Sequence, residues 1–181
     1  DEKFKEQLGD NPDLIKLGAE IVGVYLLFAT EAISSIGKRE LVSKVLSWAG
    51  DSFDPSSLLW KAMDGGVGNP GMGFNLRRDL QIGYLADFAS RWKQEPPEHR
   101  SRMLDDPWQL RDFADASSET ITSMRHVLLH LLRPDDFERI ASGEHKRQID
   151  TALRGLLPEP PPDDLDERLL AIRKRLEEIL P

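Results

Sequence analysis

Two histidines, His126 and His130, have the spacing in this chain that is most typical of metal chemistry. On a helix they lie one turn apart on the same face, where two imidazoles can share a metal ion and activate water for hydrolysis. No glutamate lies between them as in HExxH zinc sites, and the sequence offers no obvious third ligand. The alternative is structural, with one histidine bonded to a carbonyl in the core and the other partly exposed. The ligand count favours this structural interpretation.

The glycine-rich segment 65–73 matches the pattern GxGxxG at Gly66, Gly68 and Gly71. In dinucleotide-binding folds this pattern follows a strand and opens a helix that receives the pyrophosphate. Here a short helix is predicted before the pattern and Pro70 lies inside it, so we interpret the segment as a loop. The sequence has no GxxxxGK[ST] motif, and no nucleophile is visibly paired with a base.

Asn75, Arg77 and Arg78 follow this loop, where a helix is predicted to begin. Amide donors at a helix start together with two guanidiniums suit an anion such as phosphate. The alternatives are helix capping and interdomain ion pairing, because exposed arginine pairs mostly serve solubility. The other basic residues mostly alternate with acidic ones, as on a solvated, salt-bridged surface.

The composition limits the classes of function. A length of 181 residues suits one domain, or one domain with a tail. Acidic residues outnumber basic ones by 32 to 24, which gives a net charge of −8 and disfavours binding of nucleic acid over the whole surface. The absence of cysteine excludes disulfides, thiolate zinc sites and a cysteine nucleophile.

The longest apolar run, 21–29, is too short for a membrane span and indicates a buried helix. No targeting signal is visible, so we expect a cytoplasmic protein without a membrane partner. The chain begins without Met, and we expect it to be part of a longer polypeptide.

Apolar residues recur at helical spacing along most of the chain, and no run alternates cleanly as a strand does. The pattern predicts an all-α fold, an irregular multi-helix bundle. Gly37 is expected to break the chain, and Asp54 with Pro55 to start a short helix. A central helix is expected from about Glu119 to Leu132, capped by Ser117 or Ser118.

Prolines at 158 and 160–162 predict a stiff linker, 158–162. It divides the chain into a helical accessory domain, 1–157, and an amphipathic helix, 163–181. The apolar residues of that helix step by 4, 3, 4 and 3, a seam of about two heptads: Leu165, Leu169, Ile172, Leu176 and Ile179. We expect the helix to project and to pack on this domain, on a twin chain or on a downstream module.

Several motifs together resemble a known family. Residues 68–78 (GNPGMGFNLRR), followed by Phe88 and Trp92, form the first, and Asp106-Pro107-Trp108 continues it. Residues 130–138 (HLLRPDDFE) and 142–149 (SGEHKRQI) form the second. Together they resemble the helical region upstream of the AAA+ motor in bacterial McrB-like restriction NTPases, across about residues 14–156. Arg133 departs from the pattern, where an aromatic residue is expected.

The resemblance implies a parent protein in bacterial defence against foreign or modified DNA. In that setting a downstream motor in the same polypeptide binds GTP or ATP with Mg²⁺ and works with a partner nuclease, and homo-oligomers form through the parent protein. No catalytic, cofactor-binding or metal-binding residue is carried over, so this chain is expected to be no enzyme and to hold no cofactor.

The residues carried over from the resemblance form two groups. The candidate interaction surface comprises Asn69, Asn75, Arg77, Arg78, His145 and Lys146. The structural motif residues are Pro70, Gly71, His130 and Ser142. The first hypothesis is a non-catalytic accessory domain that packs, positions or transmits. The alternatives are a DNA-binding module that contacts phosphates through Asn75–Arg78 and a small metal hydrolase that uses His126 and His130.

Overall fold

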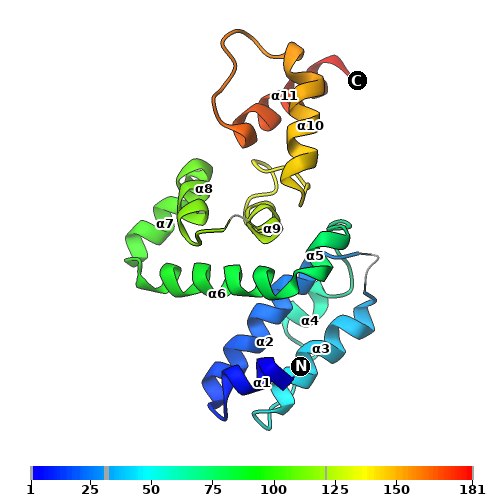
Figure 1. Cartoon of the computed structure of the whole chain (residues 1–181), viewed down its shortest axis with the longest axis vertical. Coiled ribbons are helices and arrows are strands. Elements are labelled where there is room, and N and C mark those ends of the chain that lie inside the picture. The colour runs from blue at the N-terminus through cyan, green and yellow to red at the C-terminus, as the bar shows by residue number, and fades with distance from the viewer. Residues whose placement is uncertain (1, 31–32, 121, 181) are drawn as a thin grey trace.

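The computed structural model describes residues 2–30, 33–120 and 122–180, and helices dominate this part of the chain (Figure 1). The α-helices are α1 (Glu2–Leu8), α2 (Pro12–Leu27), α3 (Ser35–Ser47), α4 (Leu58–Ala62), α5 (Met72–Leu76), α6 (Arg78–Gln94), α7 (Pro97–Asp105), α8 (Pro107–Ala116), α9 (Ser123–Leu132), α10 (Gly143–Leu153) and α11 (Leu165–Ile179). A 3₁₀ turn, η1 (Arg154–Leu156), follows α10. Within the described ranges, extended pairing is limited to one isolated bridge between Ala29 and Gly68. The predicted all-α class is confirmed.

Helix α2 organises the N-terminal half, because it packs against both α3 and α6. Asn11 caps it by accepting hydrogen bonds from the backbone of the first turn, and Pro12 occupies the first turn, where a missing N–H costs nothing. Its buried face carries Ile15, Ala19 and Leu26, all at most 3% exposed. The long helix α6 then crosses the molecule and packs against α9 (Figure 1).

Three predicted boundaries were wrong. Gly37 lies inside α3, since the hydroxyl of Ser34 caps that helix by accepting from Gly37 N. Asp54 forms a turn with the residues after it, and Ser57 caps α4 in its place. The central helix begins at Ser123 rather than near 119, so neither predicted serine caps it.

The late start of α9 has a tertiary cause. The side-chain oxygen of Gln81, which is buried on α6, accepts a hydrogen bond from Met124 N at 2.8 Å. This contact satisfies one of the N–H groups that a helix start leaves without a partner, as a cap from the same chain segment would do. Ile121, inside the range predicted for this helix, lies outside the described residues.

The helix predicted after the proline linker is α11, and it does not project freely. The linker turns the chain back, and α11 packs along α10 in the upper part of Figure 1. Leu169 and Ile172 of its seam are buried in a second apolar cluster with Leu157. The predicted division between 1–157 and 163–181 therefore does not separate two independent units. Among the described residues, no helix combines the length and apolar character that crossing a bilayer requires.

Candidate functional site

A groove of about 820 Å³ lies between the loop after α4 and helix α10. One wall carries Asn69, Pro70 and Gly71, which precede α5. The opposite wall carries Ser142 and His145 at the start of α10. These residues come from two motifs that lie far apart in the sequence. The fold therefore brings half of the residues singled out by the sequence to one place, which we call the motif groove.

The loop wall is held on the end of α2 by the backbone. Val67 N and Gly68 N both donate to the carbonyl oxygen of Phe28, at 2.8 and 2.9 Å. Gly66 approaches Ala29 so closely that a Cβ atom would lie 2.3 Å from the Ala29 carbonyl oxygen. Only glycine tolerates this approach. Helix α4 precedes the loop, so the glycines serve close packing and the loop interpretation of GxGxxG is supported.

Asn69 and Gly71 fix the turn into α5. The side-chain oxygen of Asn69 accepts a hydrogen bond from Gly71 N at 2.9 Å. Gly71 has a φ of 83°, in the left-handed region that other residues rarely adopt. Pro70 between them is buried. These contacts confirm that the asparagine, proline and glycine of the motif set the loop geometry.

The α10 wall is shaped by a helix cap. The hydroxyl of Ser142 accepts from His145 N at 3.2 Å, and the imidazole of His145 lies exposed at the groove. Arg139 lines the same groove, while no carboxylate belongs to its described lining. This is unusual for a chain with 32 acidic residues, and it makes the groove receptive to an anionic partner.

Asn75, Arg77 and Arg78 lie outside the motif groove. Asn75 is within α5, and its side-chain oxygen accepts from the hydroxyl of Tyr25 at 3.5 Å. Arg77 separates α5 from α6, and Arg78 is the first residue of α6. Both arginines are exposed, and the guanidinium carbon of Arg78 lies 5.9 Å from the centre of the Tyr25 ring. The helix start predicted here is present. Helix α6 begins at Arg78, and Arg77 occupies its N-cap position without a capping hydrogen bond from its side chain.

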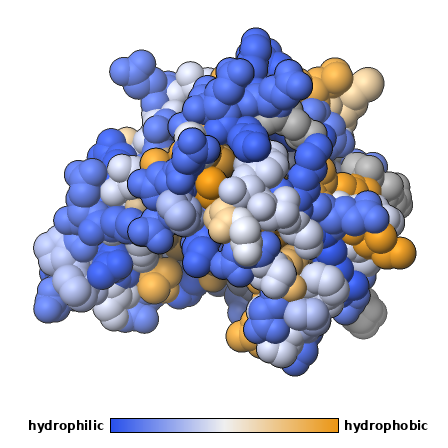
Figure 2. All heavy atoms as spheres, turned by 90° about the horizontal axis from the view of Figure 1, so that it is seen from below, coloured by the Kyte–Doolittle hydropathy of each residue, from blue (hydrophilic) through white to orange (hydrophobic). Residues whose placement is uncertain are grey.

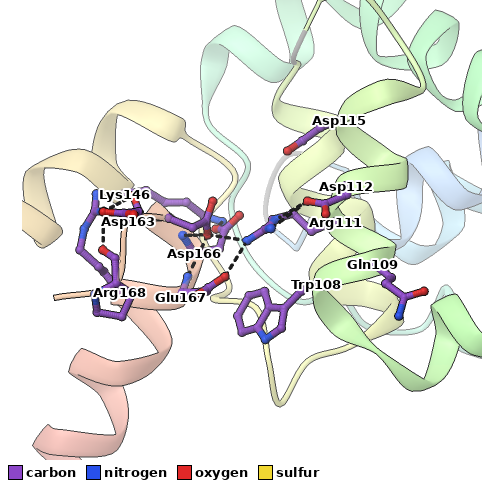
Figure 3. Close-up of polar contacts among 12 residues, drawn as sticks. Trp108, Gln109, Arg111, Asp112, Asp115, Lys146, Asp163, Asp166, Glu167 and Arg168 are labelled. Carbon is purple, nitrogen blue, oxygen red and sulfur yellow. Dashed lines mark hydrogen bonds and ion pairs between the residues drawn. The ribbon is translucent and has the colours of Figure 1, made fainter.

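Lys146 was wrongly predicted to lie on the interaction surface. Its side chain is fully buried, and its ammonium donates to Asp166 Oδ1 on α11 at 2.6 Å (Figure 3). The other oxygen of Asp166 accepts from Arg125 Nη1 on α9 at 2.5 Å. Arg125 also reaches Asp115 on α8, at 2.6 Å from Nε. One buried carboxylate thus joins α9 and α10 directly to α11, and Arg125 links it on to α8; we call these four side chains the Asp166 cluster.

Further ion pairs surround the Asp166 cluster. Arg111 of α8 contacts Asp164, the cap of α11, at 3.0 Å and Glu167 at 3.1 Å (Figure 3). On the other side, Asp150 of α10 is buried and pairs with Arg168 of α11 at 2.9 Å. The first turn of α11 is therefore held by charged contacts on two sides.

The pKa shifts in the cluster follow from burial and from these contacts. Burial raises the pKa of the Asp166 carboxyl, but the charges of Lys146 and Arg125 outweigh it and lower the pKa to about 2. Burial lowers the pKa of Lys146, and Asp166 opposes that effect. Desolvation of the half-buried His126 ring, together with the nearby charges of Lys146 and Arg125, lowers its pKa to about 3. Its imidazole is therefore neutral at neutral pH.

The two histidines are both engaged within the protein. His130 Nδ1 donates to the carbonyl oxygen of Phe137 at 2.7 Å, which is the structural role predicted for it. His126 Nδ1 accepts from Arg125 Nη1 at 3.1 Å. In residues 2–30, 33–120 and 122–180, no group of three side chains is arranged to hold a metal ion. The geometry gives no support to the metal hydrolase.

The chain matches no protein-family model, no curated protein and no solved structure. Its resemblance to McrB-like proteins therefore remains a prediction from the motifs. The sequence analysis also missed two residues that matter for the site: Asp166, at the centre of the buried ion pairs, and Arg139, which lines the motif groove. Asp166 lies next to the apolar seam of α11, and Arg139 lies in an irregular segment, where no periodicity assigns a residue to a surface.

Proposed function

We propose that this chain is a non-catalytic accessory domain of a McrB-like AAA+ restriction NTPase in bacterial defence against foreign DNA. In this proposal α11 leads into a motor in the same polypeptide, which binds GTP or ATP with Mg²⁺, and the parent protein is cytoplasmic and acts with a partner nuclease. The domain sets the orientation of the motor, and homo-oligomers form through the motor rather than through this chain.

The observation that carries the proposal is the Asp166 cluster. Its contacts tie the first turn of α11 directly to α9 and α10, and Arg111 ties the same turn to α8. Removing one partner of a buried ion pair leaves the other charge unpaired in the interior, which typically costs about 3–5 kcal/mol. A helix held in this way transmits its orientation to whatever follows it. An unattached linker of the same length would leave the next module free to rotate.

The motif groove supplies the contact surface in this proposal. Its apolar lining, the guanidinium of Arg139 and the lack of carboxylates in its described lining favour a partly apolar, acidic segment of a neighbouring module. Asn69 keeps its amide nitrogen available there, because its oxygen is used within the loop.

The test begins with the gene. Reading it past Pro181 is expected to reveal a Walker motif within roughly a hundred residues, the usual size of a domain. The purified full-length protein is then compared with an Arg139→Glu variant. We expect the variant to keep its nucleotide hydrolysis without DNA and to lose nuclease-dependent DNA cleavage. A coding region that ends without a motor, or hydrolysis of GTP or ATP by residues 1–181 alone, would contradict the proposal.

A second candidate function is DNA binding through the start of α6. It is favoured by one observation, the exposure of Arg77 and Arg78 side by side at a helix N-terminus. Binding of duplex DNA should then weaken as salt rises and be lost in the Arg77→Ala/Arg78→Ala double variant. Absence of binding at low salt would eliminate this function and leave the accessory-domain proposal untouched.

A further inference from the structure

A second cavity lies between α3 and α6, away from the motif groove. Its volume is about 560 Å³, within the range of small-molecule sites. Helix α2 lies between the two walls and contributes Val22, Tyr25 and Leu26, while α1 contributes Phe4. Hydrophilic residues dominate the surface in Figure 2, with apolar residues in separate patches, so a mostly apolar cavity of this size is a distinct feature. We call it the α3–α6 cleft.

The interior of the α3–α6 cleft is apolar and roomy. Trp48, the C-cap residue of α3, lines it, with Phe4 packed edge-on against its ring at 6.3 Å between centroids. On the opposite wall, α6 presents Gly83 and Ala86. A Cβ atom added at Gly83 meets no other atom within 4 Å, so the space in front of this helix is open. Aromatic rings beside small residues suit the flat or linear apolar part of a ligand.

The charged residues of the cleft are mainly cationic. Lys3, Lys44 and Arg78 line it, against one carboxylate, Asp79. In a chain with a net charge of −8, this local excess of positive charge is opposite to the average of the molecule. Arg78 is held near the Tyr25 ring, and a guanidinium binds a carboxylate or phosphate through two parallel hydrogen bonds. The cleft therefore combines an apolar interior with an anion-binding residue.

We propose that the α3–α6 cleft binds a small amphipathic anion, a medium-chain carboxylate being the simplest example. The head group contacts Arg78, and the alkyl tail lies over Val22 and Leu26 against Gly83. This inference is independent of the accessory-domain function, because neither the motif groove nor the Asp166 cluster takes part in it. A small ligand fits better than a partner helix, since elements from α1, α2, α3 and α6 all surround the space.

The experiment titrates the full chain with octanoate, octanol and octyltrimethylammonium, each of which has a chain of eight carbons and which differ in the charge of the head group. Binding is followed by two-dimensional amide NMR, with the indole N–H of Trp48 and the amide of Gly83 as reporters. We expect saturable shifts at both reporters, with octanoate binding most tightly. Decanoate should bind about fifteenfold more tightly than octanoate, because it has two more methylenes and each buried methylene improves affinity about fourfold.

Matched variants locate the two parts of the ligand. Arg78→Gln should weaken octanoate binding about threefold to fivefold, within the range of a partly exposed ion pair, and leave octanol binding unchanged. The neighbouring Arg77→Gln, which removes the same charge outside the cleft, should have no effect. Gly83→Leu should abolish binding of all three compounds by filling the cavity, whereas Ser90→Leu, exposed on the same helix, should not.

Three results would each contradict the proposal. Octanol binding as tightly as octanoate would indicate a merely apolar surface, such as one that receives a partner helix. Equal effects of Arg77→Gln and Arg78→Gln would mean that only the overall charge matters. Absence of saturable shifts up to millimolar octanoate, or shifts confined to residues outside the cleft, would exclude the site altogether. Because Gly83→Leu removes a helical glycine, its fold is checked by thermal unfolding, and Arg78→Gln provides the test if that variant is altered.

Discussion

The variant Asp166→Asn tests whether one buried carboxylate holds α11 on the domain. Asp166 bonds Lys146 at 2.6 Å and Arg125 at 2.5 Å, and all three side chains are at most 6% exposed. An amide in this position leaves the Lys146 ammonium in the interior without an anionic partner, and such a loss typically costs about 3–5 kcal/mol. Because Arg125 keeps its contact with Asp115, we expect the lower end of this range, about 3 kcal/mol.

The pH dependence gives a second measure of the same contact. The pKa of Asp166 is lowered from 3.8 to about 2, against the effect of burial, by Lys146 and Arg125. A lowered pKa in the folded state contributes stability that is complete above the unfolded value and is lost as the pH falls through the folded value. The stabilisation therefore disappears between about pH 4 and pH 2, and its size is about 2 kcal/mol.

Urea unfolding followed by circular dichroism measures the effect, at pH 7 and again near pH 3. Asp163→Asn is the matched control, since Asp163 is exposed in the loop just before α11 and should change stability by less than about 0.5 kcal/mol. The difference between wild type and Asp166→Asn should narrow on acidification. Equal urea midpoints for Asp166→Asn and Asp163→Asn would refute the conclusion that the Asp166 cluster holds α11 on the domain.

Three further predictions concern single contacts. Gly71→Ala should destabilise by about 1 kcal/mol in urea because its φ is 83°, whereas Gly73→Ala, in α5 with open space around it, should be neutral or stabilising. Gln81→Ala should cost about 1–3 kcal/mol by leaving the buried Met124 N–H unpaired; a smaller loss in thermal unfolding would show that water replaces the amide. The ¹⁵N shifts of the His126 ring should stay those of a neutral imidazole from pH 8 to pH 5, and a titration in that range would contradict its pKa of about 3.

Much of the fold could be predicted from the sequence because helix periodicity and capping are local. The all-α class and the glycine-rich loop after α4 follow from such local signals, and both were identified correctly. Gly37 was misjudged because a glycine near the N-terminus of a helix is tolerated when a cap such as Ser34 supports it. The start of α9 could not be found, since its partner Gln81 comes from a distant helix.

The motif groove was predictable only in part. Asn69, Gly71 and Ser142 have local roles, which turn and capping chemistry indicate directly. That the loop and the start of α10 face each other depends on the path of the chain between them. The sequence also grouped Asn69 with Arg78, although they lie on either side of the short helix α5, where Asn69 lines the motif groove and Arg78 lines the α3–α6 cleft.

The misplacement of Lys146 shows which local signal was available and overlooked. On α10, Lys146 lies one turn before Ile149 and Asp150 and two turns before Leu153, on the face that packs against α11. A lysine on an apolar helix face needs a hydrogen-bond acceptor from another element, because a buried charge without a partner is too costly. In this chain the buried Lys38 donates to the carbonyl oxygen of Gly65, and Lys146 donates to Asp166. The periodicity therefore indicates the burial of Lys146 and the existence of a partner for its ammonium. It does not identify that partner, because Asp163, Asp164 and Asp166 lie close together in sequence and only the register of α11 brings Asp166 to the ammonium.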